Sequence, residues 1–389
     1  TTTDCVYDGN LGVFGGAIRN ARDSAPRIES CGFFNNVVEQ RGGGIYNVSG
    51  ASPRIVDCTF VNNQAVIVQT LNGDTVPSVL ICGDIAETNL ARGGAICSVD
   101  EARPIIIGSR FVNNIAADGG AIASLFAAET TVMSSMLQAN DACFGGALFA
   151  SKRGQITTVN TVMARNAASV GAAALCRDNG VLELINCTIA DHVATDGGAL
   201  EAQFGARLIV RNSIAWQNTP ASFVADAISD LTVRSSIVDH EVEGLNVMMQ
   251  DPQFIDAMYR LAATSPARDA GSVNEIPADV HDVDDDGNRC ERIDIDIDGT
   301  PRFQVEDVRG TSNCDAVIDC GAYEGSAAHT RGFIWGDITA NGTIDTDDLV
   351  ALLIAFGPCD DCCFADVNAN GIVNVDDLVQ WTNEAECSF

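Results

Sequence analysis

Two twelve-residue stretches near the end of the chain have the residue spacing of a calcium-binding loop. Each places a glycine at position 6, Gly342 and Gly371, where the loop must turn sharply, and an aspartate at position 12. Oxygen atoms at positions 1, 3, 5, 9 and 12, with a main-chain carbonyl at position 7, suit Ca²⁺. The predicted ligands are Asp337, Thr339, Asn341, Thr343, Asp345 and Asp348, then Asp366, Asn368, Asn370, Ile372, Asn374 and Asp377.

Each of these loops is expected to lead into an amphipathic helix, over 349–356 and 378–382. Two further acidic runs have the pattern Asp-x-Asp-x-Asp-Gly and could chelate Ca²⁺ with a turn at their glycines. Neither run has a carboxylate at position 12, so a solvated acidic loop is an equal alternative. The run residues are Asp282, Asp284 and Asp286, then Asp294, Asp296 and Asp298.

The sequence offers few groups for acid–base catalysis. Asp118 and Asp196 are predicted to share a column but to lie three turns apart, about 14 Å, too far for a glycosidase pair. We therefore expect both on the surface. His192 is expected to hydrogen bond within a ladder of stacked side chains, and Asp191 beside it to face the opposite way. No serine-hydrolase, zinc-protease or P-loop phrase is present. The chain is predicted not to be an enzyme, with a polysaccharide lyase or glycosidase as the alternative.

Fifteen cysteines without paired zinc-binding motifs indicate an oxidising compartment, and hence a secreted protein at the cell surface or outside the cell. Cys5, Cys31 and Cys58 lie 26 and 27 residues apart, so a disulfide between adjacent turns is predicted to be possible there. An odd total leaves one thiol free or bonded between chains. The other disulfide candidates are Cys290, Cys314, Cys320, Cys359, Cys362, Cys363 and Cys387.

The element that would position these residues is a repeat. Five phrases of the type Gly-Gly-Ala-Ile begin at Gly93, Gly119, Gly145, Gly171 and Gly197, always 26 residues apart. A fixed period of this length is typical of a solenoid. The repeats are short alternating apolar segments separated by Gly, Asn and Ser, which favour strands and turns over helices. We predict a right-handed parallel β-helix with about 26 residues per turn, each turn holding three short strands.

Stacking at this period places like residues in columns. An asparagine column is predicted to form an amide ladder, and a column of large apolar residues to point inward. The same register assigns Ile85 and Thr88 to these columns, one period before Phe111 and Asn114. Residues 66–77 are expected to form an outward loop on one turn, and the coil to make roughly nine turns before fading after Val238. The predicted ladder residues are Asn36, Asn63, Asn114, Asn140, Asn166 and His192.

The composition excludes two classes of protein. A net charge of −31, with one lysine and 21 arginines, argues against a nucleic-acid-binding protein. No run of 18 apolar residues is present, so no membrane span is predicted. Much of the negative charge falls between Glu275 and Glu324 and after Arg331. Clustered carboxylates repel one another unless cations neutralise them, which again predicts bound Ca²⁺ as the cofactor.

The tandem loops, with Asp at position 12 and cysteines at 359, 362, 363 and 387, resemble a dockerin domain, in particular a cysteine-bearing subtype of planctomycete proteins. This resemblance covers about 55 residues. It implies a small helical domain that binds Ca²⁺ and docks on a cohesin-like partner. The helices lack the usual recognition pair, Ser-Thr or Lys-Arg, so the resemblance does not identify the partner.

A second resemblance covers roughly residues 212–324. Segments 212–216, 251–256, 259–261, 265–271 and 319–324 are similar, in order, to the extended β-helix of secreted choice-of-anchor proteins. In those proteins a coil ends in a surface-attachment module, and here the dockerin-like module would take that place. The resemblance implies a location outside the cell more than a chemistry.

These observations predict three parts, a β-helix over 1–245, an extension with acidic loops over 246–330 and a dockerin-like domain over 331–389. We expect a non-enzymatic structural or adhesive protein that assembles through its Ca²⁺-dependent module, into a fibre or lattice. Expected partners are other copies of the chain or a cohesin-like protein, with a polysaccharide as a further possibility. The alternative is a polysaccharide-binding or polysaccharide-degrading β-helix anchored by cohesin.

Overall fold

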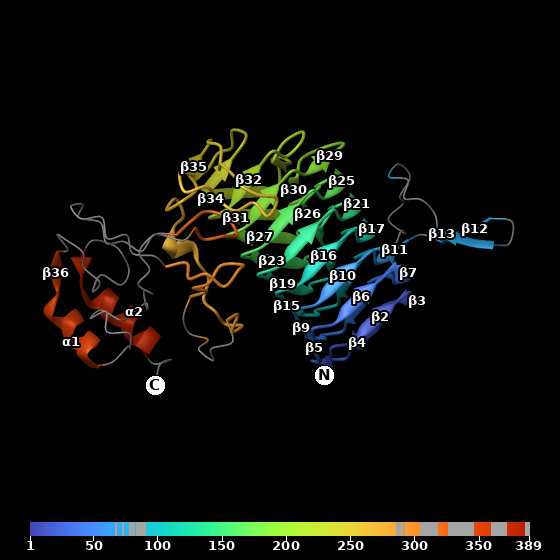
Figure 1. The fold of residues 1–389 in the computed structure, drawn as a ribbon, viewed down its shortest axis with the longest axis horizontal. Helices are drawn as coiled ribbons and strands as arrows, with labels where there is room; N and C mark the ends of the chain where they lie inside the picture. The colour runs from blue at the N-terminus through green and yellow to red at the C-terminus, as the bar shows by residue number, and fades with distance from the viewer. Residues whose placement is uncertain are drawn as a thin grey trace.

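The 26-residue repeats coil into a parallel β-solenoid of about 8 turns, shown in Figure 1. Successive turns stack in register, so that Ile122 pairs with Leu148 and Leu148 with Ala174. The predicted all-β solenoid is confirmed. The structure is a computed structural model, and it describes residues 1–66, 68–71, 74–77, 82, 91–284, 289, 292–303, 318–325, 346–358 and 372–385.

Sheet A has 18 strands in two columns, because each turn of the coil crosses it twice. The first column contains β1 (Thr2–Thr3), β5 (Arg27–Glu29), β9 (Arg54–Val56), β15 (Ile105–Ile107), β19 (Glu129–Met133), β23 (Gln155–Val159), β27 (Val181–Ile185) and β31 (Arg207–Arg211). The second contains β2 (Val6–Asp8), β6 (Gly32–Phe34), β10 (Thr59–Val61), β16 (Arg110–Val112), β20 (Met136–Gln138), β24 (Val162–Ala164), β28 (Thr188–Ala190) and β32 (Ile214–Trp216). The long strand β34 (Asp230–Val238) continues both columns and pairs with β35 (Leu245–Met248).

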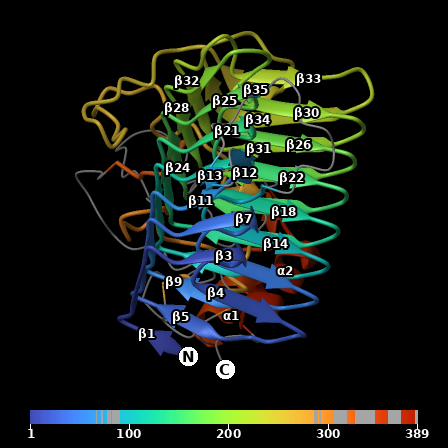
Figure 2. The same cartoon turned by 90° about the vertical axis from the view of Figure 1, so that its right-hand side faces the viewer.

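Sheets B and C complete each turn and lie side by side in Figure 2. Sheet B contains β3 (Leu11–Phe14), β7 (Val37–Arg41), β11 (Gln64–Ala65), β17 (Ile115–Asp118), β21 (Asp141–Phe144), β25 (Ala167–Val170) and β29 (Val193–Ala194). Sheet C contains β4 (Ile18–Ala21), β8 (Ile45–Val48), β14 (Ile96–Val99), β18 (Ile122–Leu125), β22 (Leu148–Ser151), β26 (Ala174–Arg177), β30 (Leu200–Gln203) and β33 (Phe223–Ala225).

Alternate side chains of each strand point into the coil and form its core. In β27, Leu182 and Leu184 are fully buried there. Because like residues recur every turn, rings stack on rings: Phe60 lies between Phe33 and Phe111, with centroid distances of 4.5 and 4.7 Å. The predicted inward column of large apolar residues is therefore confirmed, and it fixes the rotation of every turn relative to the next.

The Gly-Gly phrases turn the chain from sheet B into sheet C. The first glycine has positive φ, as at Gly93 (+65°), a conformation that other residues rarely adopt. The second has no room for a side chain, because a Cβ on Gly94 would lie 2.1 Å from the carbonyl oxygen of Gly120. The phrase is thus required by the backbone of this corner.

The predicted amide ladder runs along the corner between sheets A and B. Asn140 Nδ2 donates to Asn166 Oδ1 at 2.9 Å and to the carbonyl oxygen of Phe111 at 3.1 Å. Its own Oδ1 accepts from both nitrogens of Asn114 at 3.0 Å. His192 continues the ladder, since the Asn166 N–H donates to its Nδ1 at 3.1 Å. Counting the unpredicted ends, the members are Asn10, Asn36, Asn63, Asn114, Asn140, Asn166, His192 and Asn218.

Replacement of a ladder asparagine should destabilise the coil locally. In Asn140→Ala, the main-chain N–H of Asn114 loses its acceptor and Asn114 Nδ2 keeps only the carbonyl oxygen of Phe60, so we expect the free energy of unfolding to fall by about 2 kcal/mol. Chemical denaturation measures this difference. Gln155→Ala, on an exposed strand position, is the control and should change stability by less than about 0.5 kcal/mol. Equal losses in the two variants would contradict the ladder's contribution.

One part of the predicted register is wrong. Phe60 pairs directly with Phe111, and Asn63 bonds directly to Asn114 across 51 residues of sequence. No turn lies between them, so Ile85 and Thr88 do not belong to the columns; both lie outside the described residues. The segment after β11 is therefore an insertion about as long as one repeat. This explains why about 8 turns form where roughly nine were predicted.

The insertion carries the predicted outward loop. It begins with an antiparallel hairpin of β12 (Val68–Leu71) and β13 (Asp74–Pro77), which projects from the coil at the right of Figure 1. Cys82 in the insertion forms a disulfide with Cys143 of β21. Neither cysteine is among the predicted disulfide candidates. The disulfide fastens the insertion to sheet B two turns further along the coil.

The disulfides predicted between Cys5, Cys31 and Cys58 do not form, since all three are free thiols. They occupy the bend inside sheet A, where each Sγ donates to a nearby carbonyl and those of Cys31 and Cys58 also accept the N–H of the cysteine one turn earlier. Thus Cys31 Sγ accepts from the Cys5 N–H at 3.4 Å and donates to Glu29 at 3.1 Å. Ser109 and other hydroxyl residues fill the same place in later turns. The column therefore serves for hydrogen bonding.

Cys320 is also a free, buried thiol, whose Sγ donates to the carbonyl oxygen of Ser235 at 3.2 Å. The predicted disulfide at this position is therefore wrong. The remaining candidates, Cys290, Cys314, Cys359, Cys362, Cys363 and Cys387, lie outside the described residues.

The chain after the coil folds back over the outer face of sheet A. Apolar residues of sheet A, Ile107, Met133, Val159 and Ile185, pack against Ile276, Ile293, Phe303 and Ile318. Near the first turns, Arg54 donates to the carbonyl oxygens of His281 at 2.8 Å and Asp282 at 3.1 Å. A short 3₁₀ helix, Val273–Glu275, lies in this segment. The extension thus covers sheet A along most of the coil.

Two helices are described near the C-terminus, α1 (Thr346–Ile354) and α2 (Val375–Ala385). They begin three residues earlier than expected, because the last residues of each loop already form the first helical turn. The strands β36 (Gly357–Pro358) and β37 (Ile372–Val373) pair antiparallel. Leu352, Val373 and Trp381 are the buried apolar residues of this module within its described part.

Candidate functional site

The C-terminal module buries the two aspartates that close its predicted calcium loops. Asp348, in the first turn of α1, and Asp377, in the first turn of α2, are fully buried. Asp377 Oδ2 accepts the main-chain N–H of Asn374 at 2.8 Å, which holds the carboxylate against its own loop. Of the other predicted ligands, Ile372 and Asn374 are described, and Asp337, Thr339, Asn341, Thr343, Asp345, Asp366, Asn368 and Asn370 lie outside the described residues.

These residues fit a calcium ion by their chemistry. A carboxylate seldom becomes fully buried unless a cation or hydrogen bonds compensate its lost hydration. Both buried carboxylates stand at position 12 of loops whose other predicted donors are oxygens, the ligand type of Ca²⁺. The neighbouring Asp347 and Asp376 are exposed. The described geometry thus separates one buried aspartate from one exposed aspartate in each loop.

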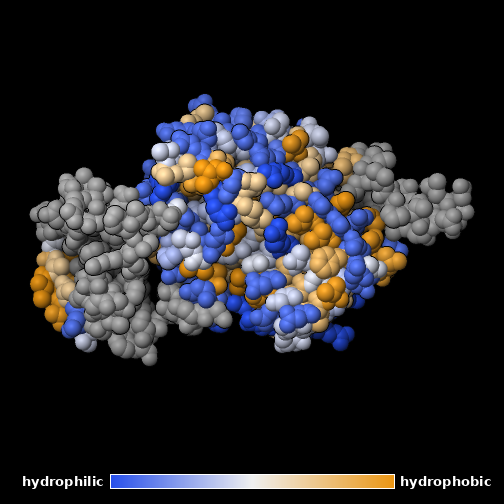
Figure 3. Space-filling view, viewed as in Figure 1, coloured by the Kyte–Doolittle hydropathy of each residue, from blue (hydrophilic) through white to orange (hydrophobic). Residues whose placement is uncertain are grey.

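The same two helices expose apolar side chains. Val350 in α1 and Val379 in α2 each stand two residues after the buried aspartate, and each is 52% exposed. Leu353 and Ile354 add to the apolar surface of α1, which appears orange at the left end of Figure 3. Single exposed apolar residues are common, but here exposed apolar residues recur on both helices.

The second acidic run forms a turn in which the protein itself occupies the carboxylates. Asp296 is buried, and its oxygens accept the main-chain N–H groups of Asp298, Thr300 and Glu324 at 2.7 to 2.8 Å. Asp298 forms an ion pair with Arg260 at 2.6 Å. The main-chain oxygen of Asp294 accepts from the N–H of Arg302. These contacts explain the run as a structural turn.

The first acidic run is described only in part. Asp282 has positive φ, and Asp282 and Asp284 are half-buried, while Asp286 lies outside the described residues. Among the described residues, no group of three or more His, Cys, Asp or Glu side chains is placed to hold a metal ion. Calcium at either run therefore stays a prediction.

The residues considered for catalysis have different surroundings from one another. Asp118 is buried and forms an ion pair with Arg92 at 2.8 Å, so its expected place on the surface is wrong; Asp196 is exposed as expected. The desolvation of that pair explains why burial raises the pKa of Asp118. His192 is fully buried in the ladder, which lowers its pKa to about 4, and Asp191 accepts a hydrogen bond from Tyr259 at 2.8 Å.

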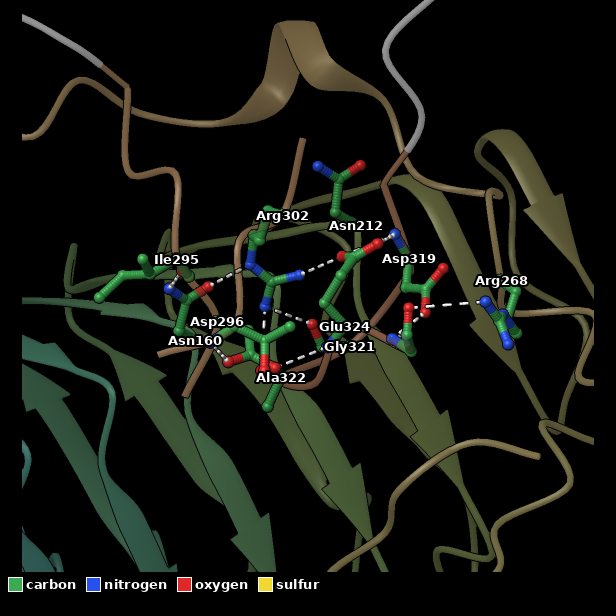
Figure 4. Close-up of polar contacts among 12 residues, drawn as sticks. Asn160, Asn212, Arg268, Ile295, Asp296, Arg302, Asp319, Gly321, Ala322 and Glu324 are labelled. Carbon is green, nitrogen blue, oxygen red and sulfur yellow. Dashed lines mark hydrogen bonds and ion pairs between the residues drawn. The ribbon is translucent and has the colours of Figure 1, made fainter. Parts of the chain in front are cut away.

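A buried polar network, which the sequence does not predict, joins the extension to the coil (Figure 4). Arg302 is fully buried and donates from Nε to Asn160 Oδ1 at 3.0 Å. Its Nη2 donates to the carbonyl oxygens of Gly321 and Ala322, both at 3.0 Å. Its Nη1 lies 3.3 Å from Glu324 Oε2. The guanidinium therefore connects the residue that follows strand β23 of the coil with two separate segments of the extension.

Three buried carboxyl groups, those of Glu324, Asp319 and Asp296, belong to this network. Burial and the nearby charge of Asp319 together raise the pKa of Glu324 to about 9. Burial also raises the pKa of Asp319 to about 6 and that of Asp296. Arg302 carries a single positive charge and can neutralise only one of these carboxylates. Glu324, whose pKa is about 9, therefore keeps its proton at neutral pH. The donors of the network bond to main-chain and side-chain groups of the protein itself. The network therefore serves to hold the extension against the coil.

Comparison with known proteins adds no family assignment. No protein-family model matches the chain, and no curated protein or solved structure is significantly similar to it. Within the described residues, no helix is both long enough and apolar enough to span a bilayer.

Proposed function

We propose that this chain is a secreted, non-enzymatic structural or adhesive protein of the cell surface, assembled through its Ca²⁺-dependent dockerin-like module. The observation that supports it best is the combination of two buried loop-closing aspartates with exposed apolar residues on the helices that follow them. Ca²⁺ bound in the loops would compensate the buried aspartates, and a partner bound on the helices would cover the exposed apolar residues. The long coil then serves as a rigid spacer, stiffened by the ladder and by the extension on sheet A.

In this proposal Ca²⁺ acts by holding each loop against the helix that begins in it. Asp348 and Asp377 close the two loops, and the ion compensates the burial of their charges. Without Ca²⁺ the acidic residues of the module repel one another, and the helices lose the loops that orient them. Partner binding through Val350, Leu353 and Val379 is therefore proposed to require Ca²⁺. The partner is a second copy of the chain or a cohesin-like protein.

Calorimetry on the full chain tests the metal sites. We expect two Ca²⁺ ions in the module, and Asp348→Ala and Asp377→Ala should each lose one, because each removes the ligand that closes a loop. Asp347→Ala and Asp376→Ala are matched controls, since they remove the same charge from the exposed neighbour. A full chain that binds no Ca²⁺, or controls that lose an ion as readily, would contradict the proposal.

Light scattering with and without a chelator tests assembly. Self-association that disappears on chelation, and in Val350→Asp with Val379→Asp, would identify a second copy as the partner. A protein that remains monomeric with Ca²⁺ at high concentration would leave the cohesin-like partner, to be tested by binding to a cohesin domain. A protein that binds neither would overturn the assembly function.

A further inference from the structure

A row of cations lies along the outside of the coil where sheets B and C meet, the two sheets seen side by side in Figure 2. Arg19 is in β4, Arg41 at the end of β7, Lys152 directly after β22, and Arg177 at the end of β26. Lys152 is the only lysine of the chain. These four residues, here called the cationic strip, span six strands of sheet C, or about 24 Å along the coil axis.

Each cation of the strip lies over an aromatic ring. The Lys152 Nζ is 5.0 Å from the centroid of Phe126, and the Arg41 Cζ is 5.9 Å from that same ring. The Arg19 Cζ lies 5.7 Å from the Tyr46 centroid, and the Arg177 Cζ 5.4 Å from that of Phe144. Such contacts hold the charged groups in place on a firm base of packed rings. Two like charges thus converge on one ring.

Three of these cations lack an anionic partner. Within the described part of the chain, no carboxylate oxygen lies within 4 Å of Arg19, Arg41 or Lys152; Arg177 alone has one, Asp178 at 3.4 Å. This is unexpected in a chain with 53 acidic residues and 22 basic ones. The Nε of Arg41 is also buried without a hydrogen-bond acceptor in the described structure. Such an unpaired donor costs free energy unless a ligand supplies the acceptor.

Packing alone does not account for the strip. Beneath it, Tyr46, Cys97, Leu125 and Phe149 form a second apolar cluster, already buried by its neighbours. Aliphatic side chains would cover this cluster as well, without bringing like charges together. The outer face of sheet A, by contrast, is occupied by the extension. Within the described coil surface, the strip is therefore the part whose unpaired charge indicates a ligand.

We propose that the cationic strip binds a carboxylated polysaccharide, such as a uronic-acid polymer, with its chain parallel to the coil axis. Each sugar ring of such a polymer carries one carboxylate, so the polymer presents a row of carboxylates. Such a row matches a row of cations better than it matches a single binding site. Guanidinium groups bind carboxylates through two parallel hydrogen bonds. A single-stranded nucleic acid is the other polyanion that a row of cations could bind, and the test below includes it as a competitor.

Binding is tested with the full chain and polygalacturonate or alginate at low ionic strength, by affinity electrophoresis and calorimetry. EDTA is included to remove Ca²⁺, so that Ca²⁺-dependent assembly plays no part in the measurement. A failure of the proposed assembly function would therefore not affect the result. We expect Arg41→Gln with Lys152→Gln to weaken binding about tenfold, because two charge contacts are lost. Arg19→Gln alone, at an exposed position, should weaken it about threefold.

The matched control removes two exposed arginines from sheet A, Arg110→Gln with Arg207→Gln, and should change affinity by less than about twofold. Equal weakening in control and strip variants would overturn the proposal, since it would show only net-charge attraction. Lack of binding to both polymers would overturn it as well. The proposal would also be overturned if a single-stranded oligonucleotide competed as strongly as the uronate and its binding depended on the same residues.

Discussion

Replacement of Arg302 by leucine should release the extension from the coil. The leucine leaves Asn160 Oδ1 and the carbonyl oxygen of Gly321 without the donor that Arg302 supplies, and the carbonyl oxygen of Ala322 keeps only the N–H of Ile297. Breaking a buried charged network on one side costs about 4 kcal/mol. Because this cost falls on the docked extension, we expect amide hydrogen exchange of residues 318–325 to accelerate at least a hundredfold, while the ladder amides of the coil stay protected.

Arg260→Leu is the matched control for this prediction. Arg260 belongs to the same extension and pairs with Asp256 at 3.2 Å and Asp298 at 2.6 Å, but its side chain is 42% exposed. Exposed pairs contribute little, so exchange in residues 318–325 should change less than about fivefold. If both variants behave alike, or if Arg302→Leu leaves exchange unchanged, then the apolar contacts of sheet A hold the extension without the network.

The coil could be predicted because a solenoid repeats its local rules. Most turns place a glycine with positive φ before a second glycine, as at Gly93 and Gly94, although Ala172 takes the second place in one turn, and most place an asparagine at the corner between sheets A and B. Each requirement therefore appears in the sequence several times at one spacing. His192 could be assigned to the ladder by position alone, although its residue type differs, because the column supplies the hydrogen-bonding partners.

The insertion was misread for the same reason. Asn63 and Asn114 are in direct contact but lie 51 residues apart, which is close to two periods. A period count cannot distinguish an additional turn from a loop of the same length, so Ile85 and Thr88 were assigned to columns. The available signal was that no Gly-Gly phrase stands between Asn63 and Gly93, so two periods contain only one such phrase. The disulfide between Cys82 and Cys143 depends on how that loop folds, which no spacing reveals.

The buried network and the cationic strip depend on contacts between distant residues. Arg302 and Asn160 are separated by 142 residues, and nothing near either of them in the sequence marks a buried partner. Arg41 and Lys152 meet over Phe126 although they come from different sheets and different turns. The predicted calcium loops differ, because their candidate ligands lie within twelve residues of one another and local sequence alone can suggest them.

The stability of the protein should decrease as the pH rises from 7 to 9. Glu324 has a pKa of about 9 in the folded protein, against an ordinary value of 4.5, so the folded state holds a proton that the unfolded state has released. Its stabilising contribution is complete below about pH 4.5 and is lost as the pH rises through 9. One retained proton changes the free energy of unfolding by up to about 1.4 kcal/mol per pH unit.

Glu324→Gln isolates this effect, because glutamine keeps the neutral shape and the hydrogen bonds but releases no proton. Other groups limit the useful range: His192, with its pKa lowered to about 4, destabilises the fold below its ordinary value of 6.5, and buried thiols such as Cys58 do so above 9. Thermal unfolding between pH 7 and 9 should therefore show a steeper decline for the wild type than for the variant. Parallel curves would mean that Glu324 is ionised at pH 7 and that Arg302 forms a full ion pair with it.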